Sequence, residues 1–170
     1  SQIDGSVSVT RLAQLDANEA GAISLSTLGG NIVLPATGSG ISLAGGGNRR
    51  LDAGGDGADI LLAQALRTAA GTITLTSADT IVTSGAGRIA PTGSGAVTLE
   101  AAGSITLGAD VVATGGLVSI NAGAALTMAD GSTVSSLGGV AADARRITLD
   151  AVGDITLSIV SAGGSVAITS

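Results

Sequence analysis

The chain of 170 residues is predicted to be an all-β protein, a parallel β-helix (β-solenoid) with three short strands in each coil. Three observations support this prediction. Apolar and polar residues alternate along most of the chain, which is the period of a strand and not of a helix. There are 28 Gly and no Phe, Trp or Tyr, so we expect tight turns around a core of slim aliphatic side chains. The third observation is an internal repeat.

The repeat is clearest from residue 71 onward, which is predicted to form regular coils. The first strands are expected to start at the inward-facing residues Ile73, Val97, Val118, Ile147 and Val166. The second strands are expected to start at Ile81, Ile105, Leu126 and Ile155, always 8 residues later. The third strands are expected to start at Ile89, Val112, Val134 and Val160. Coils of 19 to 29 residues are typical of repeat architectures.

Residues 1–70 are expected to belong to the same single domain but to form less regular coils. Residues 5–9 alternate like a strand, whereas residues 11–19 are interpreted as a surface loop or a turn of helix that covers the N-terminal end. The Gly- and Asp-rich residues 44–59 are interpreted as an irregular loop. Further strands are expected at Ile23, Ile32, Ile41, Ile60 and Leu66.

The coil that begins at Val118 contains extra residues. Its third strand takes 13 residues to reach the next first strand, against 6 in the last coil, and the excess corresponds to residues 140–146. Insertions in solenoids form external loops, so we expect this segment to be removable without loss of the fold. Its Arg145 and Arg146 could contact an acidic partner. Solvation is the simpler interpretation of this pair and of Arg49–Arg50.

The composition argues against several classes of function. The net charge is −6, and a chain without aromatic residues or a basic patch is a poor match for nucleic acid. No apolar run approaches the roughly 18 residues of a membrane-spanning helix, so no membrane insertion is expected. There is no Cys, which excludes disulfides and leaves the cellular compartment undecided.

Catalysis is not expected either. Polysaccharide-cleaving β-helices need paired acids and often His, Lys or Tyr, and these three residue types are absent. The acidic residues Asp110, Asp130 and Asp154 lie at different points of their coils and are not expected to converge. The prediction is therefore a protein with no catalytic residues and no organic cofactor.

One segment matches a metal-binding pattern. Residues 54–62, G-G-D-G-A-D-I-L-L, fit the calcium-binding nonapeptide G-G-x-G-x-D-x-U-x, in which Asp56 and Asp59 would supply oxygen ligands for Ca²⁺. Such sites are shared between successive turns, and nine residues earlier Arg50 occupies the position of the second Asp. An ordinary turn rich in Gly and Asp is the simpler interpretation.

Outward-facing Thr residues recur along the predicted strands, and flat Thr arrays on solenoids can bind ice. The row through Thr74 is interrupted by Ser119 and Ala167, and the row through Thr76 is interrupted by Glu100, Asn121 and Asp150. Thr also favours exposed strand positions in general, so ordinary strand surface is the preferred interpretation.

The repeated unit G-x-[IV]-[TS]-[LI] resembles the filamentous-haemagglutinin-like repeats of large secreted bacterial adhesins. The segments that carry the resemblance are 71–76 (GTITLT), 95–100 (GAVTLE), 103–108 (GSITLG), 145–150 (RRITLD) and 153–158 (GDITLS). The resemblance implies a right-handed β-helical shaft that is exported by a two-partner or autotransporter route and projects a binding tip. No secretion-domain motif is recognisable near the N-terminus, so the chain is expected to correspond to shaft.

The function predicted on these grounds is a structural shaft or fibre segment of an extracellular bacterial adhesin. The alternative is a ligand-binding solenoid, for Ca²⁺ or ice. Val166 and Ile168 in the last strand have no coil after them in this sequence, so we expect them to stack on another coil. That coil would come from a second copy of the chain, in a homo-oligomer or filament, or from a longer chain.

Overall fold

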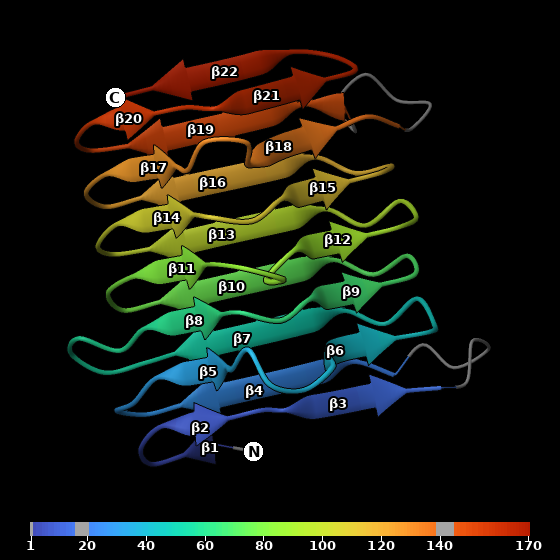
Figure 1. Cartoon of the computed structure of the whole chain (residues 1–170), viewed down its shortest axis with the longest axis vertical. Helices are drawn as coiled ribbons and strands as arrows, with labels where there is room; N and C mark the ends of the chain where they lie inside the picture. Colours follow the sequence, from blue (N-terminus) through green and yellow to red (C-terminus); the bar gives the residue numbers. More distant parts are fainter. Residues whose placement is uncertain (1, 16–20, 139–144) are drawn as a thin grey trace.

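The computed structural model describes residues 2–15, 21–138 and 145–170, and Figure 1 shows its 22 strands stacked along one axis. The strands form three parallel sheets, here called A, B and C. Sheet A contains, in spatial order, β1 (Gln2–Ile3), β4 (Ile23–Thr27), β7 (Arg49–Ala53), β10 (Ile73–Ser77), β13 (Val97–Ala101), β16 (Val118–Ala122), β19 (Ile147–Ala151) and β22 (Val166–Thr169).

Sheets B and C contain seven strands each. Sheet B consists of β2 (Val7–Ser8), β5 (Ile32–Leu34), β8 (Ile60–Leu62), β11 (Ile81–Thr83), β14 (Ile105–Leu107), β17 (Leu126–Met128) and β20 (Ile155–Thr156). Sheet C consists of β3 (Arg11–Gln14), β6 (Gly40–Leu43), β9 (Leu66–Thr68), β12 (Ile89–Pro91), β15 (Val111–Ala113), β18 (Thr133–Ser136) and β21 (Ile159–Ala162). Coils 1 to 7 are the successive sets of three strands from β1–β3 to β19–β21, and β22 follows. The predicted parallel β-solenoid with three strands in each coil is therefore confirmed.

The strand pairing confirms the predicted register of sheets A and B. Sheet A aligns the residues Ile73, Val97, Val118, Ile147 and Val166. Sheet B aligns Ile81, Ile105, Leu126 and Ile155. Because the first and second strands of a coil always start 8 residues apart, their first inward residues lie at the same point of every coil.

In sheet C the predicted start of one strand is wrong by one residue. Val111, and not Val112, pairs with both Ile89 and Val134, and it is fully buried. Two adjacent valines make either register acceptable by hydrophobicity alone. The backbone decides between them, because the N–H of Ile89 donates to the carbonyl of Asp110 (2.9 Å) and Val111 is then the next inward residue.

Two segments interpreted as loops contain strands. Within residues 44–59, β7 pairs over its full length with β4 and β10. Within residues 11–19, β3 pairs with β6, so these residues begin as part of the first coil and not as a cover over it. Pairing with a neighbouring coil overrides weak local preference in both cases. Residues 16–19 of the expected loop lie outside the described part of the chain.

The core is a narrow stack of aliphatic side chains. The residues on its axis are almost all Ile, Leu and Val, and most of them are completely shielded from solvent. The hydroxyl groups that enter the interior are used at corners: Ser77 Oγ donates to the carbonyls of Ala58 (2.7 Å) and Thr80 (2.9 Å), and Ser136 Oγ donates to that of Gly116 (2.8 Å). These buried polar groups are therefore satisfied.

The corner between sheets C and A requires glycine. Gly71, Gly95 and Gly116 occupy this corner in successive coils, and a Cβ on Gly95 or Gly116 would overlap the backbone carbonyl of the glycine below it. Glycine at this corner therefore allows the backbones of successive coils to approach each other closely. Within the described residues, no helix has the length and apolar character that crossing a membrane requires.

The alternation predicts very different costs for two substitutions to Asp. Val118 is fully buried between Val97 and Ile147, so Val118→Asp places an unpaired carboxylate between coils and should abolish folding. Thr98→Asp, on the outer face of the neighbouring strand, should cost less than about 1 kcal/mol. Circular dichroism and urea unfolding measure both effects. Equal sensitivity at the two positions would contradict the inward and outward assignment.

Candidate functional site

The candidate site residues lie on the outer faces of the rod and at its C-terminal end, and one arginine lies in the core. Among the described residues, no group of three or more His, Cys, Asp or Glu side chains is placed to hold a metal ion. Each predicted site residue is therefore considered by its position in the coils.

Asp59 takes part in a ladder of side chains at the corner before sheet B. Its Oδ1 accepts hydrogen bonds from the backbone N–H (3.1 Å) and the hydroxyl of Thr80 in the next coil. Asn31 Oδ1 accepts in the same way from the N–H of Asp59 (2.8 Å), and Ser6 Oγ accepts from the N–H of Asn31 (3.0 Å). Asp56 is exposed in a turn. The arrangement gives Asp59 a structural role, and calcium binding at Asp56 and Asp59 stays a prediction.

The outer face of sheet A is a mixed polar surface. The register places Thr74, Thr98, Ser119, Thr148 and Ala167 in one row. The next outward row consists of Asp52, Thr76, Glu100, Asn121, Asp150 and Thr169. Both rows are interrupted at the predicted positions, so this face carries acidic groups among its hydroxyls and is not a uniform Thr array.

Arg145 and Arg146 belong to coil 7 and not to an external loop. The carbonyl of Arg146 accepts a hydrogen bond from the N–H of Val118 (3.0 Å), and the carbonyl of Arg145 accepts one from Gly164 (3.1 Å). The predicted insertion 140–146 is therefore too long by two residues at its end, because these two carbonyls continue the ladder between coils. Residues 140–144 lie outside the described part of the chain.

The last strand presents its inward-facing residues to solvent. Val166 and Ile168 pair with the buried Ile147 and Leu149, yet 44% and 51% of their surfaces are exposed. The reason is that β22 pairs only with β19 and no described strand covers its other side. This end of the rod is thus both an open strand edge and an apolar surface.

One arginine lies inside the core. Arg49 occupies the inward position between Ile23 and Ile73 and is only 1% exposed. None of its side-chain nitrogens has a hydrogen-bond partner within the described part of the chain. Burial lowers the pKa of Arg49 to about 10, so the guanidinium is still charged at neutral pH. The sequence predicts that Arg49 and Arg50 are both solvated, and this is wrong for Arg49. Arg50 points outward and forms an ion pair with Asp52 (2.9 Å).

Three adjoining hollows follow the outer side of sheet C, and together they are here called the sheet C groove. Their volumes are about 380, 270 and 460 Å³ from the N-terminal end onward. The first and second share Ser39 and Ser42, and the second and third share Arg67 and Ala86. The hollows therefore run from one to the next along the rod.

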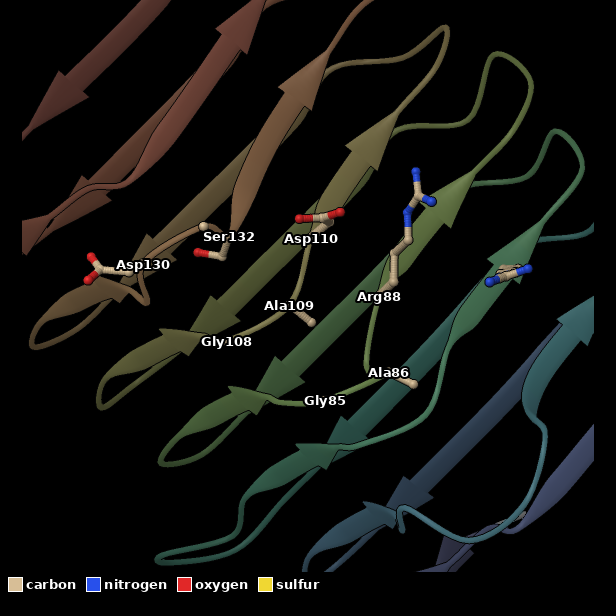
Figure 2. Close-up of a pocket in the computed structure, with 10 residues that line it drawn as sticks. Gly85, Ala86, Arg88, Gly108, Ala109, Asp110, Asp130 and Ser132 are labelled. Atoms are coloured by element: carbon tan, nitrogen blue, oxygen red, sulfur yellow. The ribbon is translucent and has the colours of Figure 1, made fainter.

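The third hollow is built from successive connections between sheets B and C, as Figure 2 shows. Arg67 and Arg88 line it towards coils 3 and 4, and Asp110 and Asp130 line it towards coils 5 and 6. Two of the acids that were not expected to converge thus share one hollow, because equivalent corners of successive coils stack along the axis. Asp110 Oδ1 also accepts a hydrogen bond from the N–H of Thr133 (3.0 Å).

Removing the buried charge should stabilise the protein. Arg49→Met replaces an unpaired guanidinium with an apolar side chain of similar length, and the free energy of unfolding should rise by at least about 1 kcal/mol. Urea unfolding measures this change. Arg50→Met is the matched control and should change it by less than about 0.5 kcal/mol, since Arg50 is exposed.

The pH dependence of this effect has a definite sign. Burial lowers the pKa of Arg49 from its ordinary value to about 10 in the folded state, so Arg49 is charged in both the folded and the unfolded state below about pH 9. The gain from Arg49→Met should be equal at pH 5 and pH 8. It should shrink only as the pH rises through 10, where the folded protein releases the proton first. A destabilising Arg49→Met would show that the guanidinium has a partner.

No family model, no curated protein and no solved structure matches this chain. The assignment of function therefore depends on the geometry of the rod and on the chemistry of its ends and faces.

Proposed function

We propose that the chain is a shaft segment of an extracellular bacterial adhesin or fibre, in which it acts as a stiff spacer. The observation that carries this proposal is the continuity of the three sheets. From β4 to β19, every coil is hydrogen-bonded to the next on all three sides of the rod. With coils about 4.8 Å apart, seven of them extend roughly 35 Å. Bending such a rod requires backbone hydrogen bonds to be stretched on at least one side.

The repeated segments that resemble adhesin repeats support the location outside the cell. Residues 95–100 and 103–108 form the equivalent parts of sheets A and B in coil 5, so each copy of the motif supplies one side of the rod.

The ligand-binding alternatives receive less support from the geometry. Asp59 Oδ1 already accepts from Thr80. The outward Thr rows are both interrupted, one by Ser119 and Ala167 and the other by the charged Glu100 and Asp150.

A shaft segment needs an axial neighbour, and the open end of β22 suits one. Val166 and Ile168 would be covered by a further β-coil, whose strand would also bond the free edge of β22. A second copy of the chain or a neighbouring coil of a longer chain would serve equally. Both continue the same three sheets along the same axis.

Mechanical stretching tests the spacer function directly. A single molecule held by handles at residues 2 and 170 should keep its length at low force and then unravel in steps. Each step should release about 60–100 Å, the extended length of one coil of 19 to 29 residues. Smooth extension at low force, without steps of this size, would contradict the proposal.

Self-association tests whether a second copy supplies the axial neighbour. Purified protein should form rods of constant width whose length increases with concentration in electron micrographs. Ile168→Lys should stop this growth and leave the monomer folded, because it places a charge in the apolar end surface. Ala167→Lys, at the neighbouring outward position, is the control and should leave growth unchanged. A chain that stays monodisperse at high concentration would assign the axial neighbour to a longer chain.

A further inference from the structure

The sheet C groove gathers arginines on a chain that is acidic as a whole. Arg11, Arg67 and Arg88 line the groove, which is three of the seven basic residues in a chain of net charge −6. All three side chains are exposed. The remaining arginines lie elsewhere: Arg49 in the core, Arg50 on sheet A, and Arg145 and Arg146 before β19.

The groove arginines are available to a ligand. Arg50–Asp52 is the one ion pair within the described residues, so Arg11, Arg67 and Arg88 have no acidic partner there. An exposed guanidinium presents a planar fork of N–H donors that binds a carboxylate or a sulfate through two parallel hydrogen bonds. The groove therefore favours an anionic ligand.

The placement of the three arginines favours a linear ligand along the rod axis. Arg11 lies in coil 1, Arg67 lies in coil 3, and Arg88 directly precedes β12, the third strand of coil 4. Since coils repeat about every 4.8 Å, Arg67 follows Arg11 at roughly two coil spacings and Arg88 follows Arg67 at roughly one. A polymer with acidic groups at regular short intervals matches this arrangement.

The groups between the arginines favour a polysaccharide over a peptide. Ser39 and Ser42 are exposed and their hydroxyls make no hydrogen bond within the described residues, while Gln64 Nε2 donates to the carbonyl of Ala36 (2.5 Å) and leaves its Oε1 as an acceptor. Such groups pair with sugar hydroxyls. Binding of an extended peptide by strand addition would need an open strand edge, and in coils 2–6 the strands of sheet C are paired on both sides.

We propose that the sheet C groove binds a linear acidic polysaccharide along coils 1–4. Arg67 and Arg88 bind its carboxylates, Arg11 binds a further carboxylate towards the N-terminal end, and Ser39, Ser42 and Gln64 bind hydroxyls between them. The acidic pair Asp110 and Asp130 repels the polymer at coils 5 and 6 and limits the length that is bound. This binding is independent of the spacer function and could occur on the side of an assembled shaft.

Fluorescence polarisation with a labelled linear oligomannuronate, long enough to cross four coils, tests the proposal on the full chain. The double variant R67Q/R88Q should weaken binding about tenfold, because it removes two exposed charge contacts and keeps the side-chain polarity. Arg50→Gln, on sheet A, should bind like the unaltered chain. D110N/D130N should bind equally or more tightly. The methyl ester of the oligomer should not bind, and added salt should weaken binding of the free acid.

Several results would overturn the proposal. Absence of binding up to millimolar oligomannuronate would do so, as would an equal loss of affinity in Arg50→Gln and R67Q/R88Q. Polyglutamate of the same charge binding as tightly would show that hydroxyl contacts play no part. Salt-sensitive dimers that R67Q/R88Q disperses, and that oligomannuronate does not, would show that a second copy occupies the groove. Urea unfolding of each variant confirms that the changes do not arise from lost structure.

Discussion

Parallel pairing between successive coils is the constraint on which the rest of this structure depends. It places every residue directly against the residue at the same position of the next coil, about 4.8 Å away. The side chain at an inward position must therefore pack against the side chains at the equivalent position in the coil above and in the coil below. Ile, Val and Leu stack well in this way, as in the column of Ile73, Val97 and Val118. The absence of aromatic residues fits the same constraint, since the interior between three closely spaced sheets is narrow.

The same constraint explains how polar groups are accommodated. Where a side chain at a corner bonds the backbone of the next coil, the arrangement repeats, as with Ser6, Asn31 and Asp59 before sheet B. Where a buried polar group finds no partner in the neighbouring coils, its desolvation is not compensated by hydrogen bonds. Arg49 lies between Ile23 and Ile73, neither of which offers a hydrogen bond, and its charge remains uncompensated within the described residues. Coil 3 is consequently the place where the aliphatic column is interrupted by a charge.

Stacking also gathers chemistry on the outside of the rod, from residues far apart in the chain. Arg88 and Asp110 lie directly before the third strands of successive coils, and they line one hollow together with Arg67 of β9 because successive coils superpose along the axis. A rod of this kind can keep its core invariant for stiffness while its outer rows vary from coil to coil. The proposed spacer function uses the invariant part of the structure, and the proposed polysaccharide groove uses the variable part.

The amino-acid pattern was sufficient to predict the solenoid and the alignment of sheets A and B, because alternation determines which side chains face inward and a constant step of 8 residues determines how strands stack. The pattern was insufficient where two neighbouring residues are equally hydrophobic, and where an inward position holds a residue that is not hydrophobic. Val111 and Val112 are equally apolar, and only the hydrogen bond between Ile89 and Asp110 decides the register. The strand β7 was missed because an arginine occupies an inward position, and pairing on both sides holds it there. The sheet C groove was beyond prediction for a related reason. The lengths of the connections between sheets B and C vary, so which outward residues become neighbours is decided only when the coils stack.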